Sequence, residues 1–225
     1  MNQATKSHAH DRLKGALTLV IMSMLSAALL FAVNRFTAPR IADNLAAARL
    51  KSLRAVLSPG SYDNEPHLDV IDVLDPKLLG SDEPLPVYRA RLGGKPVAAV
   101  LTVVAPNGFA GPIRLLVAID MDETITGVRV IEHSETPGLG DRIEPGKSDW
   151  IFRFTGRHGT DSPTGSWRLK RDGGDFDQIT GATVTSRAVL NSVHNAVLYF
   201  DAHRQDIFST RNPVRPESAN GPGNE

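Results

Sequence analysis

Three threonine hydroxyls lie close together near the C-terminal end of the sequence, where an amphipathic helical pattern begins. The first N–H groups of a helix have no acceptor within the helix, and the positive end of the helix dipole favours an anion. A glycine and an alanine between the threonines leave the backbone open to close approach. The pattern therefore favours a phosphate group here, bound or covalently attached. The segment contains Asp177, Thr180, Gly181, Ala182, Thr183 and Thr185.

The same threonines also fit a purely structural role. Serine and threonine are common N-cap residues, whose side-chain oxygen accepts a hydrogen bond from an early backbone N–H. Short motifs also match by chance. Taken alone, Thr180, Thr183 and Thr185 therefore favour a helix cap over an anion site.

A second segment, Glu135-Thr136-Pro137-Gly138-Leu139-Gly140, changes this balance. By itself it reads as a turn, because Pro-Gly is a common turn dipeptide and its glutamate could be an exposed charge. The preceding His133 and Ser134 do not indicate a hydrolase triad, because adjacency in sequence is not triad geometry and Gly-x-Ser-x-Gly is absent. The segment also lacks the third glycine of a dinucleotide fingerprint, which argues against direct NAD binding.

Together the two segments resemble the motifs of a known family. The run 177–183 is similar to Asp-x-x-Ser/Thr-Gly-Ala-Thr, the attachment motif of proteins that carry FMN esterified through its phosphate to the last threonine. The run 133–140 resembles the His-x-Glu-Thr-Pro-Gly-Leu-Gly loop of the G subunit of the Rnf electron-transport complex, which also occurs in the C subunit of the sodium-translocating NADH:quinone reductase. The resemblance extends from the membrane segment to about Phe200, and residues 173–177 read as in the Rnf protein. The chain is thus identified as a member of the FMN-binding domain family, most similar to the G subunit of the Rnf complex.

The resemblance implies that FMN is joined by a phosphodiester to Thr183. An aliphatic hydroxyl is a poor nucleophile near neutral pH, so the resemblance also implies a separate flavin transferase that uses FAD and magnesium. Asp177 is expected to be recognised by that transferase or to orient the loop. The structural alternative is that Asp177 only forms an Asx-turn. Thr136 and the backbone N–H groups of Gly138 to Gly140 are expected to be donors to the flavin ring or ribityl chain. The full set of expected cofactor-binding residues is Thr183, Asp177, Thr180, Gly181, Ala182, Thr185, Glu135, Thr136, Gly138, Leu139 and Gly140, with no catalytic residue and no metal ligand.

The function implied by the resemblance is electron relay by a flavoprotein component of an ion-translocating oxidoreductase complex, not expected to be active alone. Its implied partners are a multi-span membrane protein with a similar covalent FMN, iron–sulfur subunits, and membrane lipid. Two alternatives stay open on the residues themselves. One is a scaffold or sensor domain without redox activity, and the other is a stand-alone periplasmic flavin reductase.

Composition limits what the chain can be. Its 225 residues are 41% hydrophobic and 22% charged, which is enough for one principal domain. Lys+Arg and Asp+Glu are 25 each, so there is no broad electrostatic case for a nucleic acid partner. Cysteine is absent, so the chain alone can form no disulfide and no iron–sulfur cluster. An electron carrier held here must be organic or bound through other ligands.

An uncharged run of 19 residues, 15–33, is long enough to cross a membrane once. It exceeds a typical signal-peptide core and is followed by two arginines, which favours a retained anchor over a cleaved signal. Positive charges flank it on both sides and give only a weak preference for a cytoplasmic tail at 1–14. The resemblance implies a bacterial inner-membrane protein whose soluble domain lies on the periplasmic side.

The remaining pattern predicts an α+β domain, an antiparallel sheet with packed helices. A linker helix is expected within 34–60, with Ala46, Leu50, Leu53 and Leu57 on an apolar face that packs on the domain core or on a neighbouring subunit. The FMN-binding domain is expected over 61–204, and a disordered tail over 205–225. The predicted elements of the domain are a loop-rich stretch at 63–86, hairpins at 87–92/96–104 and 113–120/125–132, a short helix at 150–154, a strand at 167–170, and a final helix whose buried stripe is Val189, Val193, Ala196, Val197 and Phe200.

Overall fold

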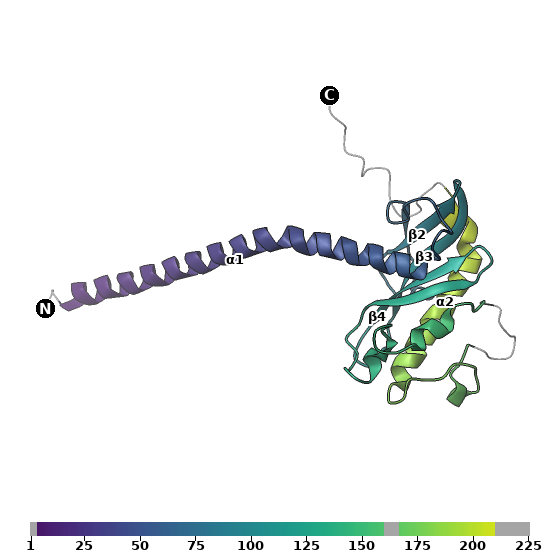
Figure 1. Cartoon of the computed structure of the whole chain (residues 1–225). Coiled ribbons are helices and arrows are strands. Elements are labelled where there is room, and N and C mark those ends of the chain that lie inside the picture. The colour runs from purple at the N-terminus through teal and green to yellow at the C-terminus, as the bar shows by residue number, and fades with distance from the viewer. Residues whose placement is uncertain (1–3, 160–166, 210–225) are drawn as a thin grey trace, which may run out of the picture. The chain divides into compact units, whose positions relative to one another are not determined.

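Five segments rich in apolar residues form a five-stranded antiparallel sheet (Figure 1). The computed structural model describes residues 4–159 and 167–209. Each strand pairs with its neighbour in the sequence, so the sheet order is β1-β2-β3-β4-β5. Both predicted hairpins are confirmed, as is the α+β class. The strands are β1 (Val70–Val73), β2 (Leu85–Leu92), β3 (Lys95–Ala105), β4 (Ile113–Asp120) and β5 (Ile125–Glu132).

The sequence prediction missed β1, which lies in the stretch expected to be loop-rich. It has four residues and pairs with β2, from Val70 opposite Tyr88 to Val73 opposite Leu85. Such a short segment between prolines has little strand signal of its own, and its conformation depends on the neighbouring strand.

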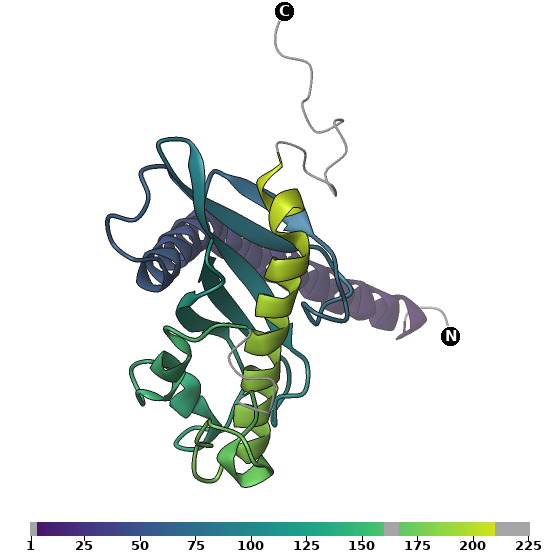
Figure 2. The same cartoon turned by 90° about the vertical axis from the view of Figure 1, so that its right-hand side faces the viewer.

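Helix α2 (Thr183–Phe208) covers one face of the sheet (Figure 2). The five residues of its predicted apolar stripe are each at most 1% exposed. They share a core with inward-facing residues of β3 and β4, such as Leu101 and Val117. The helix continues past residue 204, where the prediction had placed the tail, because Ile207 is buried in the same core. The rest of the tail predicted over 205–225, from residue 210 onward, lies outside the described residues.

The last turns of helix α1 (Ala4–Val56) cover the opposite face of the sheet. Leu53, Val56 and Leu57 are buried there with alternate residues of the strands, including Ala98 and Val100 of β3. The central strands are therefore buried on both sides, although the sheet is antiparallel. This answers the question left open by the sequence, because the apolar face of this helical segment packs on the domain core.

Strand β5 holds the end of α1 by hydrogen bonds. The Thr126 hydroxyl donates to the carbonyl of Val56 at 2.9 Å, and the Arg129 guanidinium donates to the carbonyl of Ala55 at 3.0 Å. These bonds satisfy two of the last carbonyls of the helix, which have no donor inside it. Gly127 lies against the helix backbone, and a Cβ there would stand 2.8 Å from the Cα of Val56.

Gly127→Ala is therefore expected to lower the free energy of unfolding by about 1–3 kcal/mol, the usual cost of forcing a methyl group into packed structure. The urea midpoint of the purified chain measures this change. Gly146→Ala is the matched control, because a Cβ at Gly146 has nothing within 4 Å. Equal midpoints for the two variants would contradict the close contact between α1 and β5.

The predicted tail (1–14), anchor (15–33) and linker helix (34–60) are not separate elements. Over the described residues, one helix, α1, runs without interruption from Ala4 to Val56. Pro39 removes one backbone donor inside it, and nearby the Thr37 hydroxyl donates to the carbonyl of Val33 at 2.8 Å. The window Leu19–Ala38 is long and apolar enough to span a membrane, with a mean hydropathy of 1.8 and none of it buried in the protein. Residues 1–49 and 50–225 form separate compact units.

The strand predicted at 167–170 is wrong. Leu169 makes an isolated bridge to Phe176, and Lys170–Asp172 form the short helix η3. Gly173 adopts φ +84°, and this turn brings the amide of Lys170 within 2.7 Å of the carbonyl of Phe176. The predicted short helix at 150–154 is confirmed as η2 (Trp150–Phe154), and a further short helix, η1, spans Gly140–Ile143.

Candidate cofactor-binding site

The two segments singled out in the sequence meet at one cavity of about 300 Å³. One wall comes from the loop after β5, and the other comes from the turn that begins α2. The volume is at the lower end of the range found for small-molecule sites. Its lining residues are Phe109, Glu135, Thr136, Leu139, Gly140, Gly181, Ala182, Thr183, Val184 and Thr185.

A buried hydrogen bond joins the two walls. The Thr185 hydroxyl donates to Oε2 of Glu135 at 2.6 Å, across fifty residues of sequence. The other carboxylate oxygen, Oε1, accepts from the amide of Ala110 at 3.1 Å. Glu135 is only 4% exposed and Thr185 only 1%, so the prediction that this glutamate could be an exposed turn residue is wrong. A buried carboxylate needs such donors, and it fixes the groups that supply them.

Gly140 allows this arrangement, because a Cβ at that position would overlap the Glu135 carboxylate. Gly138 has a different role. It adopts φ +79° with nothing near its missing Cβ, and it lies outside the cavity lining. It therefore serves the turn, in which the amides of Leu139 and Asp141 both donate to the carbonyl of Thr136.

His133 positions the loop and does not belong to a triad. Its Nδ1 accepts from the amide of Glu135 at 3.0 Å, so its proton is on Nε2, which faces Glu144 at 3.0 Å. Lys147 contacts both Glu144 and Asp141, at 2.6 and 2.9 Å. The ammonium of Lys147, and next His133, hold the pKa of Glu144 below its usual value, and Lys147 does the same for the pKa of Asp141.

None of the three threonines caps α2, so the capping alternative is wrong. The N-cap is Ala182, and it makes no side-chain cap hydrogen bond. Thr185 donates to Glu135 instead, and Thr180 is exposed outside the cavity. The turn before the helix is held by Ser186, whose buried hydroxyl accepts from the amide of Ile179 at 3.0 Å and donates to the carbonyl of Ala182 at 2.9 Å.

This geometry suits a phosphate joined to an aromatic ring system. Thr183 presents a hydroxyl at the cavity beside the first N–H groups of α2, to which the alanine cap offers no side-chain acceptor. Gly181 adopts φ +81°, and a Cβ there would come within 2.9 Å of Leu139. Apolar side chains stand partly exposed around the opening, namely Phe109, Leu139 and Val184. A flavin needs both features, an anion site at one end and an apolar surface for its ring.

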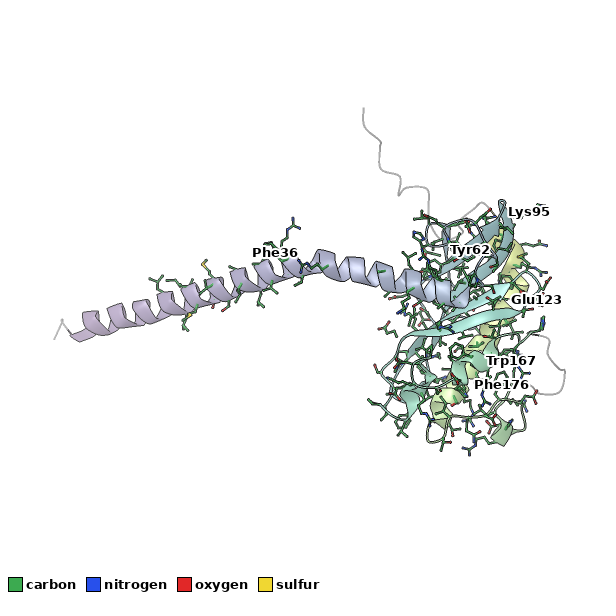
Figure 3. The ribbon with its side chains drawn as sticks, in the orientation of Figure 1. Phe36, Tyr62, Lys95, Glu123, Trp167 and Phe176 are labelled. Atoms are coloured by element: carbon green, nitrogen blue, oxygen red, sulfur yellow. The ribbon has the colours of Figure 1, made fainter. Side chains whose placement is uncertain are left out.

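Asp177 lies outside the cavity lining and is held by two cations. Lys170 contacts its carboxylate at 2.9 Å, and Arg153 forms a second ion pair with it. Lys170, and next Arg153, hold the pKa of Asp177 below its usual value. The Trp150 indole also donates to its carbonyl at 2.6 Å. Trp150 belongs to an aromatic cluster in which Trp167 and Phe176 stack with centroids 5.4 Å apart (Figure 3).

Sequence reasoning missed Phe109, Val184, Ser186 and Arg171. Phe109 had a usable signal, because it is a lone aromatic residue in a turn between Gly108 and Gly111. It is 70% exposed at the opening of the cavity. Arg171 had none, because only the folded chain brings its guanidinium to the hydroxyl of Thr183, at 3.3 Å.

Two family models and several known proteins match this chain. The family model for the FMN-binding domain matches residues 108–198, a range that contains all of the lining residues, and the model for the RnfG N-terminal region matches residues 1–56. The chain is 44% identical to the G subunit of the ion-translocating oxidoreductase complex of Pseudomonas aeruginosa, over 98% of this chain and 99% of that protein. It is 46% identical to the G subunit of the same complex of Pseudoalteromonas atlantica, over 76% of this chain and 81% of that protein. The crystal structure of Shewanella oneidensis NqrC is similar with a TM-score of 0.47 and 24% identity, over 64% of this chain and 74% of that one.

Proposed function

Because this chain belongs to the family of G subunits of the ion-translocating oxidoreductase complex, we propose that it carries FMN covalently on Thr183 and relays electrons within that complex. Membership of the family and the FMN-binding domain make it a flavoprotein component of a membrane complex. The observation that carries the finer proposal is the position of the Thr183 hydroxyl. It lies at the cavity formed by both motifs and is not used to cap the helix.

The attachment step joins Oγ1 of Thr183 to the flavin-side phosphorus of FAD, breaks the bond between the two phosphates, and releases AMP and the hydroxyl proton. A hydroxyl needs a base or metal to be activated. Among the described side chains, the one hydrogen-bonded to Oγ1 is Arg171, a permanent cation that cannot accept a proton. Activation by a separate transferase with magnesium is consistent with this. Glu135 and Thr185 then act by fixing the walls of the cavity.

When bound, FMN supplies the redox chemistry, and the chain supplies its position. The cavity is open to solvent on the side of Phe109, Leu139 and Val184, all of which are partly exposed. An open site lets partner redox centres approach closely. A covalent bond keeps the cofactor there through many turnovers.

We expect the partners to be other components of the complex, including a multi-span membrane flavoprotein and iron–sulfur proteins. The flavin is the one electron carrier that the proposal assigns to this chain, so electrons enter and leave through it. The scaffold and the stand-alone reductase alternatives both stay testable.

The test is the intact mass of the chain coexpressed with a flavin transferase. We expect a gain of one FMN less one water, with visible absorbance that persists after denaturation. An unchanged mass would support the scaffold alternative and contradict the proposal. The relay is tested by reconstituting the complex with loaded or unloaded chain, and turnover without any partner protein would instead support a stand-alone reductase.

The domain after the candidate span is expected to lie on the periplasmic side of the bacterial inner membrane. A reporter that is active only outside the cytoplasm should therefore be active when fused after Ser209, which follows the last turn of α2. A fusion before Leu19, on the other side of the span, is the control and should be inactive. The reverse pattern would show that the domain is cytoplasmic.

A further inference from the structure

Arg171 contacts the residue proposed to carry the flavin. Its Nη1 donates to Oγ1 of Thr183 at 3.3 Å, between η3 and the first residue of α2. The Arg171 side chain is 56% exposed and is not part of the cavity lining. The guanidinium therefore approaches the hydroxyl from outside the cavity.

The loop that carries Arg171 is firmly tied. The amide of Lys170 donates to the carbonyl of Phe176 at 2.7 Å, and the amide of Gly174 donates to the carbonyl of Leu169 at 3.0 Å. On the same loop, Asp172 is held by the Arg187 guanidinium through bonds of 2.6 and 3.1 Å. Arg171 is thus presented to Thr183 by a defined backbone.

Two carboxylates in the segment before Thr183 are each shared by two cations. Lys170 and Arg153 share Asp177, whereas Arg187 and Arg171 share Asp172. Asp172 is bonded mainly to Arg187, because the closest approach of Arg171 to it is 4.0 Å. Over the part of the chain that the structure describes, Arg171 therefore directs its closest donor at a neutral hydroxyl rather than at a carboxylate.

We propose that Arg171 binds the phosphodiester formed on Thr183, and the flavin-side phosphate of FAD while that bond is made. This inference rests on the proposed covalent attachment. The non-bridging oxygens of the phosphate are two bonds from Oγ1, which places them within reach of a guanidinium that already contacts Oγ1. A phosphodiester carries one negative charge, and guanidinium groups bind phosphate oxygens through paired N–H donors. Arg171 is a ligand of the phosphate group and takes no proton.

The test compares Arg171→Gln, Arg171→Lys and a control, Arg168→Gln, which removes the same charge from an exposed residue of the same segment. The full chain is incubated with FAD, magnesium and a limiting amount of transferase, and flavin loading is followed by intact mass. We expect Arg171→Gln to load about tenfold more slowly, which corresponds to the loss of one charge-assisted hydrogen bond. Arg171→Lys should lie between Arg171→Gln and the wild type, and Arg168→Gln should match the wild type.

A second measurement does not depend on loading rate. After complete loading, the ³¹P resonance of the phosphodiester should shift in Arg171→Gln and should stay unchanged in Arg168→Gln. If wild type loads but Arg171→Gln matches it in both rate and resonance, the role of Arg171 is refuted and the proposed attachment stands. If wild type acquires no flavin, the proposed function fails, and this inference fails with it.

Discussion

Thr183→Val is expected to abolish covalent flavin while the domain stays folded. Valine has nearly the volume of threonine but lacks the oxygen that the phosphodiester requires. Among the described residues, the side-chain hydrogen bond lost is the one with the exposed Arg171, which contributes less than about 1 kcal/mol to stability. The helix start does not depend on Thr183, because its N-cap is Ala182. Intact mass and absorbance after denaturation measure the bound flavin, and circular dichroism measures folding.

The neighbouring threonines make this test specific. Thr180→Val changes an exposed residue outside the cavity and should retain flavin. Thr185→Val removes the donor to the buried Glu135 carboxylate, so it should lower stability and still leave Oγ1 of Thr183 free to react. Peptide mapping that finds FMN on Thr180 or Thr185 would contradict the assignment, as would a Thr183→Val protein that stays yellow after denaturation.

Glu135→Ala is expected to have the largest effect on stability among the residues of the site. It leaves the Thr185 hydroxyl and the Ala110 amide without their acceptor and opens a cavity at a position that is 4% exposed. Each loss of a buried partner costs about 1–3 kcal/mol, so the two losses together cost about 2–6 kcal/mol. For a domain of this size, that lowers the melting temperature by roughly 5–15 °C.

Two controls separate the buried contact from the loss of charge. Glu135→Gln keeps one acceptor oxygen and nearly the same shape, so it should lose less than half as much stability as Glu135→Ala. Glu132→Ala removes a glutamate whose side chain is 75% exposed, and its melting temperature should stay within about 2 °C of the wild type. A Glu135→Ala variant that melts like Glu132→Ala would show that the two walls are held by other contacts.

Where local pattern and tertiary packing agree, the sequence predicts the fold. Both hairpins were predicted, since each consists of two apolar runs joined by a short turn, and Gly93-Gly94 marks the first turn. The stripe of α2 was predicted from the spacing of its apolar residues. The strand at 167–170 was wrong because the turn at Gly173 folds residues 168–176 back on themselves, which strand propensity alone does not predict.

The candidate site, too, was predicted only in part from the sequence. The two segments were recognised from their residues, but their contact through Glu135 and Thr185 depends on strands that bring residues fifty positions apart together. The capping role was favoured for the threonines because these residue types cap helices often. In the structure the N-cap residue is Ala182, and the hydroxyl of Ser186 in the first turn of α2 donates to the carbonyl of Ala182. Arg171 could not be predicted, because its role depends on where a neighbouring loop folds.

The burial of the sheet on both faces has a consequence for how this domain tolerates insertions and deletions. Along β3, Ala99 and Leu101 face the core shared with α2, whereas Ala98 and Val100 face the last turns of α1. A single-residue deletion in this strand would shift its register and exchange the two sets, because side chains alternate between faces. Residues that fit against α1 would then face the core beneath α2, and residues of that core would face α1. Length changes should therefore be confined to the connecting loops, while β3 keeps a fixed length even where its individual residues vary.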